Sequence, residues 1–265
     1  MKKISALLLI FAMLFSFAAC NGGEEEETTK RQYYKEDGET IVFENPNLTI
    51  PEKLFSVVSV DDYTKEESKP NTTQSSGVTM IQKRYTLKKD NKNTIPVKVN
   101  SGSTEILLGK TLLKDVVAKG WSYSGKVNES TTLNAGKTGV VGLINADGQV
   151  LRLTVKNNTS GDIAIGECVV VEFGFVSSVE VEGGWADFTF ADSIKKNSSY
   201  EAVIKALGSP DKINVAEKYK GNDFSTCSVT LNYSNQVGDK TYTVSIAYDD
   251  DGKTAVLNSL TVSVK

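Results

Sequence analysis

One stretch decides the fold class: Cys227-Ser228-Val229-Thr230-Leu231-Asn232-Tyr233. Apolar and polar side chains alternate along it with a period of two, as in a β-strand that has one buried and one solvated face. The same alternation recurs in residues 241–248 and 255–264. The polar residues Asp249 to Lys253 form a turn between these two runs. The pattern therefore predicts an antiparallel sheet with one face on a core and one face in water.

A short helix is expected just before this sheet. Its apolar face is formed by Tyr200, Val203, Ile204 and Leu207. Ser198, with Glu201 three residues later, predicts a capping box at the start of the helix, and Gly208 with Pro210 predicts its end. Phe188 and Phe190 alternate as in a strand that precedes the helix. We expect the helix to cover the apolar side of the sheet.

The preceding part of the chain follows a similar order. Residues 111–119 predict a helix, with Thr111 as N-cap and Gly120 at its end, and strand-like runs follow at 139–145, 150–156 and 163–176. Each half thus has a strand, a short helix and three strands, offset by about 87 residues. The nearly continuous apolar run from Cys168 to Phe175 is expected to lie where the two halves meet.

These patterns predict an α+β fold of two tandem repeats, each a short helix packed on one face of an antiparallel β-meander sheet. The first repeat spans residues 98–182 and the second spans residues 183–265. Residues 41–97 are expected to hold short strands at 41–43 and 54–60, a Ser/Thr-rich loop at 64–77, and a strand at 78–87.

The start of the chain carries an export signal. Lys2 and Lys3 precede an apolar run that ends in Phe17-Ala18-Ala19-Cys20. The run is shorter than the about 20 residues of a transmembrane helix. We therefore expect residues 1–19 to be a lipoprotein signal peptide, removed ahead of a lipidated Cys20. The alternative is a plain secretory signal in which the cysteine is incidental.

Residues 20–40 are expected to be a flexible acidic tether, with Glu24 to Glu27 near its start. Together with the lipidated cysteine, such a tether predicts an exported protein on the outer face of a bacterial membrane. The acyl chains alone would hold it to the membrane.

Composition excludes several classes of function. The chain has 265 residues, with 30 basic and 33 acidic side chains and a net charge of −3. Histidine is absent, which excludes Ser-His-Asp and Cys-His catalysis and nearly all zinc sites. No basic stripe is present, so nucleic acid is not an expected partner. We expect neither a cofactor nor a metal.

Two further cysteines, Cys168 and Cys227, lie inside strand-like runs. In an exported protein they could form one disulfide. A lone cysteine within a strand is also often a small buried apolar residue. Sequence alone cannot pair them, so both alternatives stay open.

Two short motifs bear on catalysis and on metal binding. Residues 193–196, Ser-Ile-Lys-Lys, match the Ser-x-x-Lys spacing of acyl-transfer enzymes, but the segment is polar and its companion motifs are missing, which favours a loop. Residues 249–252, Asp-Asp-Asp-Gly, suggest calcium. The twelfth position counted from Asp249 is Leu260 instead of glutamate, which excludes an EF-hand and favours a hairpin turn.

The segment from Asn197 to Asp211 carries a resemblance to a known family. Its polar cap, short helix, Leu-Gly-x-Pro ending (residues 207–210) and following meander resemble repeats of the β-lactamase-inhibitor-protein type, which are related to the BamE/SmpA envelope lipoproteins. The resemblance covers residues 185–265 well and 98–176 poorly, where Lys119-Gly120-Trp121 replaces the ending. It implies contact with another protein, and no catalysis. The Ser/Thr-rich open face argues against β-lactamase inhibition itself.

The predicted function is therefore a membrane-anchored extracytoplasmic protein-binding module, inhibitor-like or assembly-like, whose partner is an unknown envelope or secreted protein. Trp121, Tyr123 and Trp185 are candidate contact residues, because exposed aromatics make good binding anchors. They could equally close the ends of small cores. The alternatives are a solute- or glycan-binding lipoprotein and a hydrolase with an unrecognised carboxylate site.

Overall fold

The computed structural model describes residues 51–68, 78–89, 94–220 and 223–265. It also places the backbone of three short strands, which are β1 (Tyr33–Tyr34), β2 (Thr40–Ile41) and β4 (Asn71–Thr73). Its contacts divide the chain into residues 1–42 and 43–265. In the first unit, β1 and β2 pair as antiparallel strands. The predicted signal peptide and Cys20 lie outside the described residues.

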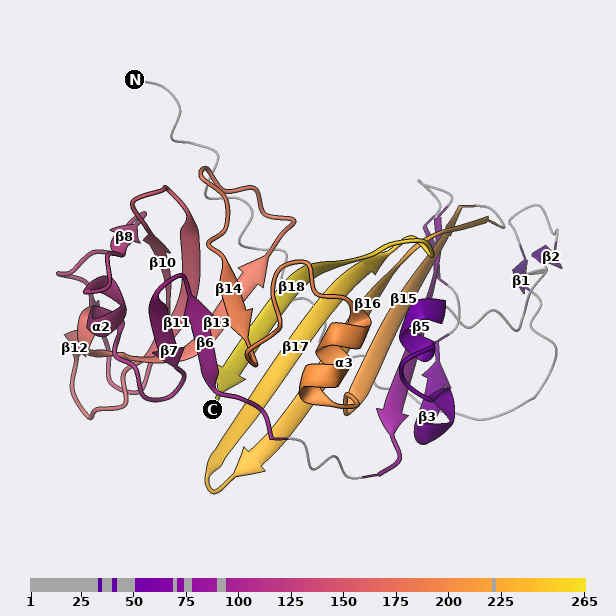
Figure 1. Ribbon diagram of the computed structural model, residues 1–265, viewed down its shortest axis with the longest axis horizontal. Coiled ribbons are helices and arrows are strands. Elements are labelled where there is room, and N and C mark those ends of the chain that lie inside the picture. Colours follow the sequence, from indigo (N-terminus) through magenta and orange to yellow (C-terminus); the bar gives the residue numbers. More distant parts are fainter. Residues whose placement is uncertain are drawn as a thin grey trace. The chain divides into compact units, whose positions relative to one another are not determined.

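One antiparallel sheet dominates the described part of the second unit (Figure 1). Ten strands follow one another in an unbroken hydrogen-bonded path, and β4 pairs with β5 beside that path. The spatial order is β3 (Tyr63–Glu67), β5 (Val78–Leu87), β15 (Lys212–Lys220), β16 (Asp223–Val237), β17 (Lys240–Asp250), β18 (Ala255–Val264), β13 (Val169–Val176), β11 (Val150–Lys156), β10 (Thr138–Ile144) and β8 (Ser122–Ser124). We call it the main sheet.

The other described elements are small. A three-stranded sheet has the order β14 (Phe188–Phe190), β6 (Lys98–Ser101) and β7 (Thr104–Leu107), and a two-stranded sheet pairs β9 (Thr132–Leu133) with β12 (Ile163–Ala164). The α-helices in the described residues are α1 (Glu52–Phe55), α2 (Leu113–Val117) and α3 (Tyr200–Leu207). None of these helices has the length and apolar character required to cross a membrane.

The alternation in the C-terminal strands produces the core as predicted. On β16, Cys227, Val229 and Leu231 are fully buried, whereas the intervening side chains are partly exposed. Helix α3 packs over β16 and β17 (Figure 1), and the rings of Tyr200 and Tyr248 lie 4.3 Å apart, centroid to centroid. The antiparallel sheet with a helix on its apolar face is confirmed.

Strand β13 lies where the two halves of the chain meet, as expected. It pairs with β11 on one side and with β18 on the other, so Phe173 lies opposite Val262. Phe173 and Phe175 are buried and contact the ring of Phe188 at 5.3 and 5.2 Å between centroids. Val171 and Glu172 are only half-buried, so the strand is not enclosed on both faces along its whole length.

Both predicted N-caps were wrong by one residue. The amide of Leu107 donates to Thr111 Oγ1, and α2 begins after Leu112 instead. Helix α3 begins at Tyr200, so its cap is Ser199, whose hydroxyl accepts from the amide of Ala202 at 3.3 Å. In both places the hydroxyl that was expected to cap the helix instead accepts a hydrogen bond from a backbone amide earlier in the chain.

The predicted strand at 163–176 is interrupted. A 3-10 turn, η3 (Ile165–Glu167), separates β12 from β13, and the amide of Cys168 closes it by donating to the carbonyl of Ile165. Gly166 lies in this turn, and glycine weakens a strand interior. Strands β8 and β15 were both missed, so four strands of the main sheet, instead of three, follow each of α2 and α3.

Residues 54–60 do not form the expected strand, because α1 ends at Phe55, a turn follows, and a 3-10 turn begins at Val60. Leu54, Val57 and Val58 are spaced as on one face of a helix, and α1 together with the 3-10 turn η2 (Val60–Asp62) replaces the expected strand. Within the expected loop at 64–77, β3 and β4 pair with β5, and the rest of that segment is described only as far as residue 68. The strand at 78–87 is confirmed as β5.

Polar side chains occupy one end of the core face. The register places Ile81, Glu217, Cys227 and Asp250 side by side across four strands. Glu217 is fully buried, where it accepts hydrogen bonds from Lys83 Nζ and, at 2.9 Å, from the hydroxyl of Tyr219. Asp250 is buried and accepts from the hydroxyl of Tyr200 at 3.1 Å. The carboxylates are satisfied, as buried charges must be.

This environment changes the acidity of Cys227. Burial, followed by the charges of Asp250 and Glu217, raises the pKa of the thiol to about 12. Burial also raises the pKa of Tyr63 to about 12, and the Tyr63 hydroxyl donates to the carbonyl of Pro210 at 2.9 Å. The folded chain therefore holds these protons more tightly than the unfolded chain does.

Substituting Lys83→Met should destabilise the protein by about 3–5 kcal/mol, because it leaves the buried carboxylate of Glu217 without its cation. Adding Glu217→Gln should recover more than half of the loss. The exposed neighbour Arg84→Met on the opposite face is the control and should change stability by less than about 0.5 kcal/mol. Urea unfolding at pH 7 measures all three. A Lys83→Met loss no larger than that of Arg84→Met would contradict the assignment.

Stability should fall as the pH rises from about 9 to 12, because the native thiol of Cys227 keeps a proton that the unfolded thiol, with a pKa near 8.5, releases. In Cys227→Ala the slope of unfolding free energy against pH should be less steep by up to about 1.4 kcal/mol per pH unit. Urea titrations at successive pH values test this, with Ser228→Ala as the control that keeps the wild-type slope. Parallel curves for wild type and Cys227→Ala would exclude the effect.

Candidate functional site

The three candidate aromatics occupy separate positions. Trp121 is 6% exposed, and its Nε1 donates to Thr104 Oγ1 at 3.0 Å, so it belongs to the core. Tyr123 is half-buried on β8, the last strand of the main-sheet path. Trp185 is half-buried, and its Nε1 donates to the carbonyl of Val179 at 2.9 Å. No ring contact in the described part of the chain joins two of them.

The cysteines are two buried free thiols. Cys227 lies on β16, and Cys168 lies just ahead of β13, where its Sγ contacts the carbonyl of Ala164 at 3.8 Å. Of the two alternatives left open by the sequence, this arrangement corresponds to the buried thiols.

The first short motif lies in a turn, whereas the second begins at the end of β17 and continues into the turn that follows. The hydroxyl of Ser193 donates to the carbonyl of Ala191, whereas Lys196 Nζ donates to the carbonyl of Trp185 and pairs with Asp187. Ser193 and Lys196 thus have different partners. Residues 251–254 connect β17 and β18, and Asp251 accepts from the amides of Lys253 and Thr254. Nowhere in the described ranges do three acidic or cysteine side chains gather in a way that would hold a metal ion.

One face of the main sheet carries polar side chains across six strands. We call it the open face, because the described helices and the β14-β6-β7 sheet pack on the core side (Figure 1). The register aligns one row across β15, β16, β17, β18, β13 and β11. This row consists of Lys212, Asn232, Ser245, Thr261, Gly174 and Arg152. Parallel rows contribute further hydroxyls, and those of Thr243 and Ser263 lie 2.7 Å apart.

A glycine shapes the end of this row. A Cβ added to Gly174 would lie 2.6 Å from Nη1 of Arg152, so the guanidinium lies across the β13 backbone where a side chain would otherwise be. In the described residues Arg152 has no ion pair. Its guanidinium is therefore available to a carboxylate or carbonyl group from outside the sheet.

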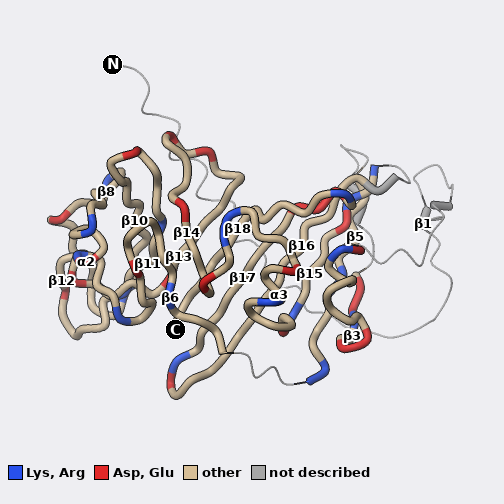
Figure 2. The backbone as a smooth tube through the Cα atoms, in the orientation of Figure 1, with Lys and Arg blue, Asp and Glu red and all other residues tan. Residues whose placement is uncertain are grey.

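Charge is concentrated at the margins of the open face. Figure 2 shows the lengths of β16, β17 and β18 almost without charged residues. On the flanking strands, Arg84, Lys212, Lys218 and Arg152 are basic, and Glu66 and Glu172 are acidic. Arg84 and Glu66 form an exposed ion pair at 3.9 Å, and Asp249 lies near the end of β17. The face thus has a neutral hydroxyl- and amide-rich centre between basic margins.

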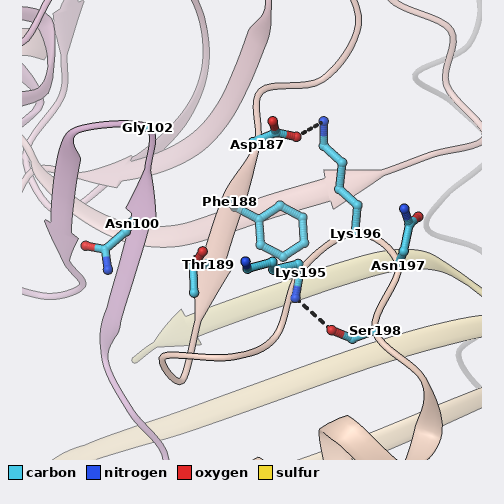
Figure 3. A pocket seen from close by; sticks show the side chains of 9 residues that line it. All are labelled: Asn100, Gly102, Asp187, Phe188, Thr189, Lys195, Lys196, Asn197 and Ser198. Carbon is cyan, nitrogen blue, oxygen red and sulfur yellow. Dashed lines mark hydrogen bonds and ion pairs between the residues drawn. The ribbon is translucent and has the colours of Figure 1, made fainter.

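A cavity of about 530 Å³ lies on the core side, between β6, β14 and the segment that leads into α3 (Figure 3). Phe188 contributes the aromatic part of its lining. The remaining lining residues are polar or glycine, and they are Asn100, Gly102, Asp187, Thr189, Lys195, Lys196, Asn197 and Ser198. None of the three aromatics proposed from sequence lines it.

Sequence reasoning missed this cavity. Its residues come from three segments, and the pairing of β14 with β6 brings Thr189 opposite Asn100. The Ser-x-x-Lys motif did mark the right neighbourhood, since Lys195 and Lys196 line the cavity. No periodic signal could have indicated the pairing, because both strands are very short.

Comparison with known proteins gives no identification. No family model matches the chain, and neither the curated proteins nor the solved structures contain a match.

Proposed function

We propose that this protein is a binding module that captures another envelope or secreted protein on the open face of its main sheet. The observation that carries this proposal is the size of that face. Six strands spaced about 4.8 Å apart span about 24 Å, and a length of about nine residues adds 30 Å, or about 700 Å². A standard protein interface buries about 800 Å² per partner.

The charge of the face indicates the chemistry of the partner. Basic side chains at the margins favour a partner surface rich in carboxylates, and among them Arg152 has no ion pair within the described residues. The neutral centre offers hydroxyl and amide groups, which donate and accept hydrogen bonds and suit a polar, hydrated interface. Association should therefore weaken as salt increases.

We also propose that residues 98–182 and 183–265 are tandem repeats of the β-lactamase-inhibitor-like type. In support, four strands of the main sheet follow each of α2 and α3, and the last strands of the two sets, β13 and β18, are neighbours. Helix α3 ends at Leu207, Gly208 has a φ of 76°, and Pro210 follows, as in the resembling motif. This relationship favours binding over catalysis.

The location of the protein is a further part of the proposal. Cys20 would carry acyl chains after removal of residues 1–19, and the tether that follows would hold the binding domain away from the outer face of the membrane. A partner in the envelope or in the medium would then be within reach.

The open face is tested by capture with cross-linking and mass spectrometry. The full chain in detergent should retain one saturable partner from the producer's envelope or medium, and Arg152→Glu or Ser245→Arg should weaken binding at least tenfold. Lys205→Glu on α3 is the control on the covered side and should bind as wild type does. Melting temperatures verify that each variant is folded. Capture that is unaffected by both face variants, or no partner at micromolar concentration, would overturn the proposal.

The lipid anchor is tested by Cys20→Ser in a bacterial host. Wild-type protein should incorporate radiolabelled palmitate and enter the detergent phase on Triton X-114 partitioning, because acyl chains provide the membrane affinity. The Cys20→Ser chain should take up no label and stay in the aqueous phase after cleavage, or keep its leader. Equal labelling of both proteins would contradict lipidation at Cys20.

A further inference from the structure

Hydrogen bonds within the protein hold both walls of the cavity in Figure 3. Ser101 lies opposite Phe188 in the β6–β14 pairing, and its hydroxyl donates to the carbonyl of Asp187 at 2.9 Å. On the other wall the amide of Lys195 donates to the hydroxyl of Ser198 at 2.8 Å. Preformed walls reduce the entropy cost of binding.

Backbone hydrogen bonds also fix the turn that precedes Lys195. Phe190 and Ile194 exchange both backbone hydrogen bonds at 2.8 Å, which closes a tight turn. Ala191 and Asp192 within it have φ values of 49° and 59°, an uncommon conformation for residues other than glycine. The surrounding structure must stabilise such a conformation. The turn leads directly into Lys195, which lines the cavity.

The ring of Phe188 forms the floor of the cavity and is packed against two other rings. Phe188 is 3% exposed and packs edge-on against Phe173, with a second ring contact to Phe175. In Figure 3 its ring lies among the polar lining side chains. The ring is therefore almost wholly covered, and the groups free to meet a ligand are those of the polar lining residues.

The polar groups specify the ligand further. Asn100, Asn197, Thr189 and Ser198 carry amides and hydroxyls, which both donate and accept and so complement a ligand with many hydroxyl groups. Lys196 is neutralised by Asp187 at 2.9 Å. Lys195 is exposed and has no acidic partner among the described residues, which leaves one positive charge at the cavity.

We propose that this cavity binds a saccharide unit that carries a carboxylate. The hydroxyl and amide groups of the lining receive the sugar hydroxyls, and Lys195 receives the carboxylate. The volume of about 530 Å³ falls in the range of small-molecule sites, about 300–1,000 Å³. The cavity lies on the core side of the main sheet, so this site is separate from the proposed protein-binding face.

Ligand-observed NMR titration of the full chain in detergent tests the assignment. Methyl β-glucuronide should bind with a Kd in the millimolar range, and methyl β-glucoside, which lacks only the carboxylate, should bind at least about tenfold more weakly. Lys195→Gln should remove this preference, and Thr189→Val should weaken both sugars. Lys119→Gln, an exposed lysine beyond α2, is the matched control and should leave both affinities unchanged.

Three results would overturn the proposal. Equal affinity for the two sugars would exclude recognition of the carboxylate. Acetate binding as tightly as the glucuronide would reduce the site to an anion contact. No binding of either sugar at tens of millimolar would exclude a saccharide site altogether. Because Arg152→Glu lies on the other face, it should leave sugar binding intact whether or not a protein partner exists.

Discussion

The structure depends on the backbone pairing between β13 and β18. Five residue pairs join these strands, from Glu172 opposite Ser263 to Val176 opposite Ser259. Without this pairing each set of strands would expose an edge with unsatisfied amide and carbonyl groups. With it, the apolar faces form one continuous core, in which Phe173 lies beside Val262. Both the open face and the cavity exist because the two halves share one sheet.

The core face of the main sheet changes from apolar to charged along its length. Around α3 the core is apolar, with Val203 and Leu207 buried against the strands. Toward Glu217 and Asp250 the core face becomes charged, and each carboxylate needs its own partners. The buried ion pair of Glu217 with Lys83 adds little net stability but penalises arrangements that leave one partner alone. This end therefore favours one register of β15 on β16 and β5.

The two proposed sites use opposite sides of this framework. The open face is formed by side chains of consecutive strands, so its neutral centre and basic margins follow directly from the alternation in β16, β17 and β18 (Figure 2). The cavity is formed by short segments that pack on the core side, and its shape depends on a turn at Ala191 and Asp192. A broad surface suits a macromolecule, whereas a small cavity suits a small ligand. One domain can carry both because the sites share no residues.

The amino-acid sequence by itself determined the strands with clear period-two alternation, the helix on Val203 and Leu207, and the polarity of the face that points away from the core. These features are local, since each depends on residues within one element or its immediate turn. Caps and short strands were not determined this way. Thr111 and Ser198 resemble N-caps, but their hydroxyls make loop contacts instead. The short strand β8 was missed, and so was the nine-residue strand β15 inside the main sheet.

Only the tertiary structure decided which distant segments meet. It buried Trp121 against Thr104, left Cys168 and Cys227 apart as free thiols, and brought Asn100, Thr189 and Lys195 to one cavity. The physical reason is that pairing between strands far apart in the chain is selected by the packing of the whole core. Short strands such as β6 and β14 carry too few residues to specify their partners on their own.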